Sequence, residues 1–245
     1  MSMDRSRTEL LIACVYRLLE GCRTIAVGNS SPIPGSAALL RRAQDPSTRV
    51  LMLGSRRHNA FTDGGRELFD CAAQGRIDAF FLGGGQIDGQ GNINLVGLGP
   101  YPKITHRFPG SFGSAFLYYV VPRVILFREE HTSRVMVPRV DFISAPGTSA
   151  PEVHRPGGPH ALVTGRCVFA FDKAKQRFRL DSVHPGHGLE EVRDHTGFDF
   201  DCPDHVPQTA APDETVLNLL RRQIAAEVAE TYPRFAERMW GARAA

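Results

Sequence analysis

A short apolar strand runs directly into three glycines in the stretch Phe80-Phe81-Leu82-Gly83-Gly84-Gly85-Gln86-Ile87-Asp88-Gly89-Gln90-Gly91-Asn92-Ile93-Asn94. Glycine lets backbone N–H groups approach a ligand closely, and it tolerates positive φ angles that strain other residues. At the carboxyl end of a buried strand, such a loop lies at the rim where open α/β sheets bind ligands. Gly83, Gly84 and Gly85 are therefore candidate backbone donors to a ligand. A plain strand-end turn, with Asn and Asp as turn formers, explains the same pattern.

Two common nucleotide-binding motifs do not fit this loop. Gly83-x-Gly85 begins like a dinucleotide fingerprint, but Asp88 occupies the third glycine position and no amphipathic helix follows. A phosphate-binding P-loop requires Gly-Lys-Ser or Gly-Lys-Thr, which the loop lacks. We expect Asp88 to brace the turn. The polar side chains expected to orient a ligand or the loop are Gln86, Asn92 and Asn94.

Strands alternate with short helices in the first half of the chain. A helix is expected from the capping box Ser6–Glu9 to Gly21, followed by strands at 24–27, 49–53, 79–82 and 123–127 and helices through 39–40, 66–74 and 114–119. This alternation favours a largely parallel sheet with helices on its faces. After Glu129, strand-like pieces at 134–137, 140–143, 167–171 and 178–183 predict hairpins laid against the same sheet. The expected end is a helix at 190–195 and an amphipathic helix at 213–235 that is interrupted near Pro233. We expect one domain over residues 1–245.

Composition narrows the class of protein. The chain has 245 residues, 42% of them apolar, and a net charge of +3 from 29 basic and 26 acidic residues. No basic run is interleaved with aromatic residues, so nucleic acid is not expected as a partner. The five cysteines are scattered without a C-x-x-C pair, which suits reduced thiols. No apolar run reaches membrane-spanning length, and we expect a cytoplasmic protein with no membrane partner.

Two catalytic constellations are set aside. His184 and His187 are the closest histidine pair, but Pro185 and Gly186 between them break the helix that would present both on one face, so no metal site is expected. The second glycine cluster, Pro109-Gly110-Ser111-Phe112-Gly113, lacks the G-x-S-x-G elbow of serine hydrolases. It does precede a short helix that Ser114 can cap, where free N–H groups collect.

Four stretches taken together resemble the β subunits of two-subunit family I coenzyme A transferases, such as glutaconate CoA-transferase. The stretches are Leu82–Asp88 with Gly91–Asn94, Pro109–Gly113, Val140–Gly147, and Val183–Gly186 with Glu191-Val192 and Thr196–Phe198. The resemblance covers residues 24–200. It implies an α/β fold of the NagB/RpiA/CoA-transferase-like class, with an open, mostly parallel sheet, helices on both faces and C-terminal hairpins.

The resemblance also implies a chemistry. Such a β subunit pairs with a homologous α subunit as a heterodimer or heterotetramer, acyl-CoA lies between them, and no other cofactor is bound. The glycine loop would supply backbone donors to the thioester oxygen, each worth about 3 kcal/mol in the transition state. The substrate-binding residues that it implies are Gly83, Gly84, Gly85, Gln86, Asn92, Asn94, Pro109, Gly110, Ser111 and Gly113.

The catalytic residue is the point of departure from that family. Related β subunits carry a nucleophilic glutamate after the strand that here ends at Leu53, but this chain has Gly54 and Ser55 there and no glutamate nearby in the sequence. Glu67 falls on the following helix, where a solvated role is expected. The catalytic residue is therefore unknown from this chain. The arrangement is similar to the β subunit of the bacterial steroid ring-cleaving CoA hydrolase, whose glutamate resides in the partner.

We therefore expect one half of a heteromeric enzyme that transfers CoA between acyl groups with a partner's glutamate. An acyl-CoA hydrolase or ring-opening subunit of steroid or aromatic catabolism, and a non-catalytic acyl-CoA-binding module, stay open as alternatives. The loop hypothesis also predicts that Gly84→Val abolishes turnover while leaving the fold largely intact.

Overall fold

The computed structural model describes residues 5–243, whose contacts group them into two compact units. Unit 1 combines the N-terminal residues through Cys71 with residues 76–81 and the C-terminal residues from Ala210. Unit 2 comprises residues 72–75 and 82–209. The single domain expected over residues 1–245 stays a prediction, and each unit is described by itself.

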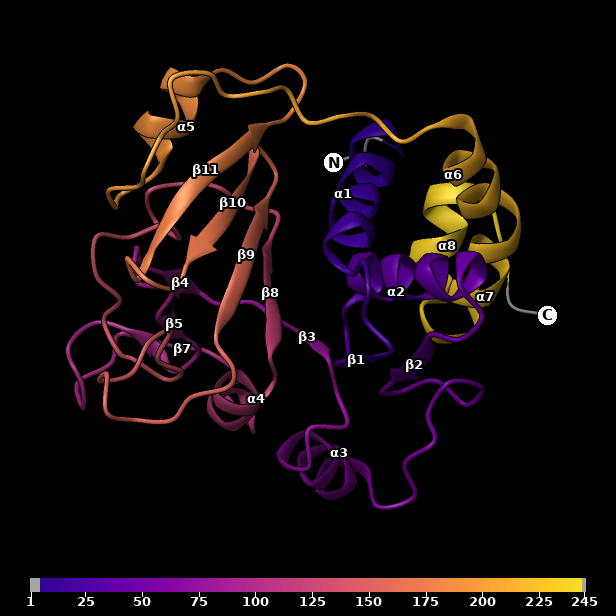
Figure 1. The fold of residues 1–245 in the computed structure, drawn as a ribbon, viewed down its shortest axis with the longest axis horizontal. Coiled ribbons are helices and arrows are strands. Elements are labelled where there is room, and N and C mark those ends of the chain that lie inside the picture. The colour runs from indigo at the N-terminus through magenta and orange to yellow at the C-terminus, as the bar shows by residue number, and fades with distance from the viewer. Residues whose placement is uncertain (1–4, 244–245) are drawn as a thin grey trace. The chain divides into compact units, whose positions relative to one another are not determined.

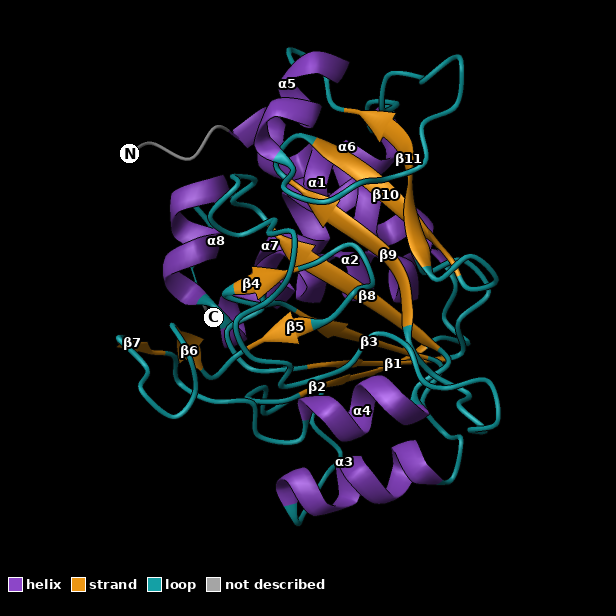
Figure 2. Ribbon diagram, turned by 90° about the vertical axis from the view of Figure 1, so that its left-hand side faces the viewer, coloured by secondary structure: helices purple, strands orange, loops and turns teal. Residues whose placement is uncertain are grey.

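Unit 1 is built on three parallel strands. Strand β1 (Thr24–Val27) lies between β2 (Arg49–Met52) and β3 (Ala79–Leu82), with Thr24 opposite Arg49 and Ile25 opposite Ala79. The helices α1 (Arg5–Leu18) and α2 (Pro32–Gln44) lie on one side of these strands and α3 (Gly64–Ala73) on the other (Figures 1 and 2). Ile25, Ala26 and Val27 are fully buried, as expected for a parallel strand covered on both faces.

The C-terminal helices belong to the same unit. They are α6 (Glu214–Leu219), the π-helical turn η1 (Leu220–Ile224), α7 (Ala225–Thr231) and α8 (Pro233–Trp240), of which α6, η1 and α7 contact α2. The Asp213 carboxylate caps α6 by accepting the Val216 N–H at 2.8 Å. The interruption expected near Pro233 is confirmed, because Pro233 begins α8.

The first helix begins differently from the expectation. Arg5 is already helical, so the Ser6–Glu9 capping box does not start the helix. Glu9 is instead buried, and its carboxylate accepts hydrogen bonds from the Arg221 guanidinium at 2.7 and 2.9 Å and from Trp240 Nε1 at 3.1 Å. A buried carboxylate requires such partners, and these tie α1 to the C-terminal helices.

Unit 2 contains four longer strands. β8 (Arg123–Arg128) pairs in parallel with β9 (Pro159–Thr164), and β10 (Cys167–Asp172) pairs antiparallel with β9 and with β11 (Arg177–Val183). The smaller elements are the hairpins β4 (Gln86–Ile87) with β5 (Ile93–Asn94) and β6 (Gly97–Leu98) with β7 (His106–Arg107), and the helices α4 (Ser114–Val120) and α5 (Leu189–His195). Figure 1 shows α5 at one end of β11 and α4 at the opposite end of β8.

The α/β class with parallel strands, helices on both faces and antiparallel C-terminal hairpins is confirmed. Two predicted strands are wrong: residues 134–137 and 140–143 form no strand, because Pro138 lacks an amide hydrogen and interrupts any ladder. Residues 134–137 make an isolated bridge between Met136 and Ile87. No helix among residues 5–243 combines the length and the apolar character needed to cross a bilayer.

Candidate functional site

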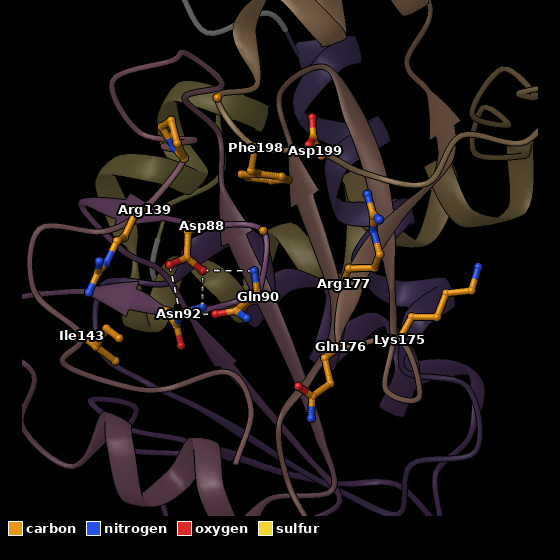
Figure 3. Close-up of a pocket in the computed structure, with 13 residues that line it drawn as sticks. Asp88, Gln90, Asn92, Arg139, Ile143, Lys175, Gln176, Arg177, Phe198 and Asp199 are labelled. Atoms are coloured by element: carbon orange, nitrogen blue, oxygen red, sulfur yellow. Dashed lines mark hydrogen bonds between the residues drawn. The ribbon is translucent and has the colours of Figure 1, made fainter. Parts of the chain in front are cut away.

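The second half of the glycine loop is a tight turn held by one carboxylate. Asp88 joins β4 to β5, and its Oδ1 accepts the N–H groups of Gln90 and Asn92, each at 3.1 Å, while its Oδ2 accepts Asn92 Nδ2 at 3.0 Å. Figure 3 shows these bonds converging on the carboxylate. Asp88 is buried and braces the turn, as the sequence predicts.

The amide side chains chosen from the sequence also hold the hairpin. Asn94 is fully buried; its Nδ2 donates to Gln86 Oε1 at 2.8 Å and to Gly97 O at 2.7 Å. Gln86 Oε1 accepts the Asp141 N–H as well, and Asn92 Oδ1 accepts the Gly147 N–H at 3.0 Å. These side chains therefore orient the loop, and a role in orienting a ligand stays a prediction.

The three consecutive glycines are packed against the protein. A Cβ added to Gly84 would lie 2.6 Å from Ile93 Cγ2 and 2.7 Å from Gln86 O, and one added to Gly85 would lie 2.3 Å from the Phe108 ring. A Cβ at Gly83 would meet a backbone carbonyl at 2.9 Å. The expectation that Gly84→Val leaves the fold intact is therefore wrong, because a side chain there overlaps backbone and core atoms.

A polar cleft of about 650 Å³ lies beside the braced turn. One wall is the loop itself, at Asp88–Gln90 and Asn92, and the others come from segments far away in the sequence: Pro138, Arg139, Ile143, Lys175, Gln176, Arg177, Gly197, Phe198 and Asp199. In Figure 3, Arg139 and Ile143 flank the turn on one side, and Lys175, Gln176 and Arg177 on the other. Gly83, Gly84 and Gly85 do not line this cleft.

The cleft is lined by three basic side chains, Arg139, Lys175 and Arg177, and by two acidic ones, Asp88 and Asp199. Lys175 and Arg177 both contact Asp201, at 2.8 and 3.1 Å, and the hydrogen bond from Lys175 lowers the pKa of Asp201. The Arg139 side chain makes no ion pair or hydrogen bond with any residue that the structure describes. The cleft can therefore receive a polar or anionic ligand, with Arg139 as an exposed cation and Phe198 as an apolar wall.

The second glycine cluster lies elsewhere on the surface of unit 2. Pro109 and Gly110 are exposed, Ser111 and Gly113 are half-buried, and none of them lines the cleft. Gly110 has a φ of +107° with open space around its Cβ position. The two glycine motifs come together at Phe108, which precedes Pro109 and covers Gly85.

The expected capping by Ser114 is wrong. Gly113 occupies the N-cap position of α4 without a side-chain hydrogen bond. The Ser114 hydroxyl is buried and has no hydrogen-bond partner in the described part of the chain.

A glutamate missed by the sequence reasoning reaches the turn after β2, in unit 1. Gly54 has a φ of +88°, and Ser55 is buried. The Glu230 carboxylate, from α7, accepts the Ser55 hydroxyl at 2.7 Å and the Arg56 N–H at 2.7 Å. The expectation that no glutamate is nearby thus holds along the chain and is wrong in space, because the two partners are 175 residues apart.

This carboxylate is engaged by donors. Burial raises the pKa of Glu230, but hydrogen bonds from Thr231, from the Arg56 N–H and from Ser55 outweigh it, so the pKa lies below its usual value. The Ser55 oxygen accepts the His58 N–H at 2.9 Å, which makes it a turn-forming group. A carboxylate stabilised in this way is a weak nucleophile, since its lone pairs are already shared with donors.

The other residues considered from the sequence as catalytic or metal-binding candidates have structural contacts. Glu67 lies partly exposed at the surface, as expected, and it also accepts the N–H groups of Thr62 and Asp63, which stabilises the start of α3. Within residues 5–243, no cluster of His, Cys, Asp and Glu could hold a metal ion. His184 is buried between Thr209 Oγ1 and Thr164 O.

Comparison with a family model places this geometry in context. The model described as "Coenzyme A transferase" matches residues 11–195. The match includes the β4–β5 hairpin and, apart from Gly197, Phe198 and Asp199, the walls of the cleft.

Two curated relatives share a segment of this chain. A 3-oxoadipate CoA-transferase subunit from Pseudomonas knackmussii is 36% identical over 154 residues, covering 60% of this chain and 58% of the relative. The cholesterol ring-cleaving hydrolase IpdB subunit of Rhodococcus jostii is 31% identical over 160 residues, covering 64% of this chain and 62% of the relative. The chain thus spans less than two thirds of the length of either relative.

A solved structure extends the likeness over most of the chain. The crystal structure of Rhodococcus jostii RHA1 IpdAB superposes with a TM-score of 0.78 at 26% identity, covering 88% of this chain and 93% of that one. The fold expected from the sequence is confirmed by this match.

Proposed function

The chain belongs to the coenzyme A transferase family, and we propose that it is a β-type subunit of a heteromeric enzyme that transfers CoA between acyl groups, with the catalytic glutamate supplied by a partner subunit. The observation that carries the proposal is the polar cleft beside the Asp88–Asn92 turn, whose loop lies inside the matched residues. The partner is a homologous α subunit, in a heterodimer or a heterotetramer.

In this proposal the loop at 83–94 shapes the acyl-CoA pocket through its braced turn, and the segment Pro109–Gly113 contributes from outside the cleft. The braced turn presents Gln90 and the Asn92 edge to the cleft, and Arg139 supplies an exposed cation for a polar part of the substrate. The Gly85 N–H already donates to Asn94 O at 2.9 Å, so that amide maintains the hairpin. Backbone polarisation of the thioester would fall to other amides of the loop.

The attacking carboxylate is assigned to the partner for a physical reason. Glu230 is the carboxylate that reaches the Gly54–Ser55 turn, and its hydrogen bonds from Ser55 and Arg56 both stabilise the anion and orient it toward the turn. An attacking carboxylate needs a lone pair directed at the thioester carbon. Glu230 is therefore proposed to support the turn.

The likeness to a ring-cleaving hydrolase subunit favours a second reaction. In this alternative the complex hydrolyses a ring-containing acyl-CoA in steroid or aromatic catabolism. The two reactions differ in whether a glutamyl-CoA thioester accumulates on the enzyme.

Trapping experiments test the proposal. The chain is co-purified with a candidate homologous α subunit and incubated with acyl-CoA and borohydride. Both polypeptides are then analysed by mass spectrometry. Reduction of a partner glutamate supports CoA transfer. Release of CoA without reduction of either chain supports the hydrolase, and acyl-CoA binding without a partner or turnover supports a binding module instead.

Glu230→Gln is the matched variant. The amide oxygen can accept the Arg56 N–H, whereas the amide nitrogen replaces the oxygen that the Ser55 hydroxyl donates to. The turn therefore loses one hydrogen bond, but trapping on the partner should persist, because the proposed nucleophile is untouched. Reduction of Glu230 in the wild type, together with its loss in Glu230→Gln, would place the nucleophile in this chain and refute the assignment to the partner.

A further inference from the structure

A second, smaller cleft in unit 2 combines two cationic side chains with no carboxylate. Its volume is about 180 Å³, and the polar side chains that line it are Thr148, Ser149, Arg155, Lys173 and Gln176. None of its lining residues is Asp or Glu. Gln176 also lines the larger cleft, so the two clefts share a residue. A space of this size suits one small charged group, since sites for whole drug-sized ligands are larger.

The Arg155 guanidinium is held in a fixed orientation. It donates to Pro146 O at 2.7 Å, to Tyr118 O at 3.1 Å and to Ser149 Oγ at 3.2 Å. Its Cζ lies 5.3 Å from the centre of the Tyr118 ring and 5.6 Å from that of Tyr119. A cation fixed before a ligand arrives loses little side-chain entropy on binding.

One donor of this guanidinium is unsatisfied. Arg155 Nε is buried and has no hydrogen-bond partner within the described residues. A Cβ at Gly158 would lie 3.6 Å from it, so glycine at this cleft-lining position keeps a side chain from packing over the nitrogen. A buried unpaired donor is rare in native proteins and calls for a partner that the polypeptide does not provide.

Lys173 adds a second cation that lacks a counter-charge. It makes no hydrogen bond or ion pair with the residues described, and burial, followed by the charge of Arg155, lowers its pKa. His160, on β9, has its pKa lowered by burial and then by Arg123 and Lys173. Uncompensated positive charge in a partly desolvated cleft attracts an anion.

We propose that this cleft, the Arg155–Lys173 cleft, binds a phosphate group. A guanidinium, an ammonium and the hydroxyls of Thr148 and Ser149 match a tetrahedral dianion that accepts several hydrogen bonds at once. Inorganic phosphate and the phosphates of coenzyme A offer the same chemistry. The inference does not depend on the proposed reaction, because it concerns binding alone.

Calorimetric titration of the full chain with inorganic phosphate, in a buffer free of other anions, tests the site. We expect saturable binding that Lys173→Met weakens about tenfold or more, since it removes a charged hydrogen-bond donor. Lys103→Met, which removes the same charge from an exposed loop residue lining neither cleft, should leave the affinity unchanged. Thr148→Val should weaken binding less than Lys173→Met, because the hydroxyl is neutral.

The source of the phosphate follows from two further ligands. If Lys173→Met weakens coenzyme A but not 3′-dephospho-coenzyme A, the bound group is the 3′-phosphate. If it weakens inorganic phosphate alone, the site serves the free anion. Wild-type protein that binds no phosphate ligand, or a folded Lys173→Met protein that binds all of them like wild type, overturns the proposal. Tighter binding of acetate or succinate than of phosphate would overturn it too.

Discussion

The protonation of His131 should make the stability of unit 2 depend steeply on pH. Its ring is 2% exposed, with Nδ1 2.8 Å from Thr164 Oγ1 and Nε2 2.8 Å from Thr196 Oγ1. The Thr196 hydroxyl donates to Val192 O at 2.6 Å, so it accepts from Nε2–H, and Nδ1 accepts from Thr164. A second ring proton, on Nδ1, would force the Thr164 hydroxyl to turn away from the ring and donate to Cys167 O, 3.2 Å away. Burial, and then the charge of Arg166, lowers the pKa of His131 to about 3.

The size of the effect follows from the two pKa values. The unfolded chain takes up its histidine proton near the ordinary value of about 6.5, whereas the folded protein resists it until about 3. Between these values the unfolded state binds more protons, so stability is complete above about pH 6.5 and falls as the pH is lowered. Integrating this difference from about pH 8 to about pH 5 gives a loss of about 2 kcal/mol from His131 alone.

Urea denaturation at a series of pH values measures this loss. The free energy of unfolding is determined at about pH 8, 7, 6 and 5 for the wild type and for His131→Asn, which cannot titrate. His106→Gln, at an exposed strand position, controls for removing any histidine. The difference in slope between wild type and His131→Asn isolates the contribution of His131, whatever the variant's absolute stability.

Three results would contradict the role of His131. If His131→Asn loses as much stability between about pH 8 and pH 5 as the wild type does, then His131 is not held neutral by burial. If His106→Gln flattens the dependence as much as His131→Asn does, the effect belongs to histidines in general. His131 ring signals in NMR spectra that titrate near pH 6.5 in the folded protein would directly contradict the lowered pKa of His131.

Three further changes test the supports of the hairpin and of the helices. Gly84→Ala should lower the free energy of unfolding by at least about 2 kcal/mol in urea melts, because the added Cβ would lie 2.6 Å from an isoleucine methyl carbon. Gly188→Ala is the control and should be tolerated, because its added Cβ meets nothing within 4 Å. Asp88→Asn should cost about 2 kcal/mol and speed amide hydrogen exchange in its turn, because one oxygen acceptor becomes a donor that faces donors. Glu9→Gln should cost about 1–3 kcal/mol and lower the melting temperature, because it leaves Arg221 without its ionic partner.

The sequence predicted those elements whose signal is local. The strands at 24–27 and 79–82 have the expected bounds, because each is an apolar run bounded by polar, turn-forming residues. Strand β9 was missed, because it begins at Pro159 after a Pro- and Gly-rich segment and its apolar run is only Ala161–Val163. It forms through pairing with β8 and β10, which supplies order that its own composition does not.

In the candidate site too, the sequence predicts the local contacts and not those between distant segments. Asp88 was identified because its partners, Gln90 and Asn92, lie two and four residues away, within reach of an Asx-type turn. The opposite walls of the cleft come from a hairpin turn and from loops around Arg139 and Phe198, which no local pattern connects to the glycine loop. The sequence does not predict the contact of Glu230 with the turn after β2, because the docking of α7 is what brings the two together.

The glycines of the loop carry the most ambiguous signal in this sequence, and the structure separates its two meanings. A glycine kept for ligand access should leave open space where a Cβ would be, as at Gly110, whereas one kept for packing should have atoms within overlap distance, as at Gly84 and Gly85. Both kinds look alike in a sequence, because each simply lacks a side chain. The triple glycine therefore lets Phe108 and Ile93 close over the hairpin, and this closure places the braced turn at the cleft. Under the proposed function, ligand specificity rests with the side chains of the other walls, where substitutions should alter binding while leaving the hairpin intact.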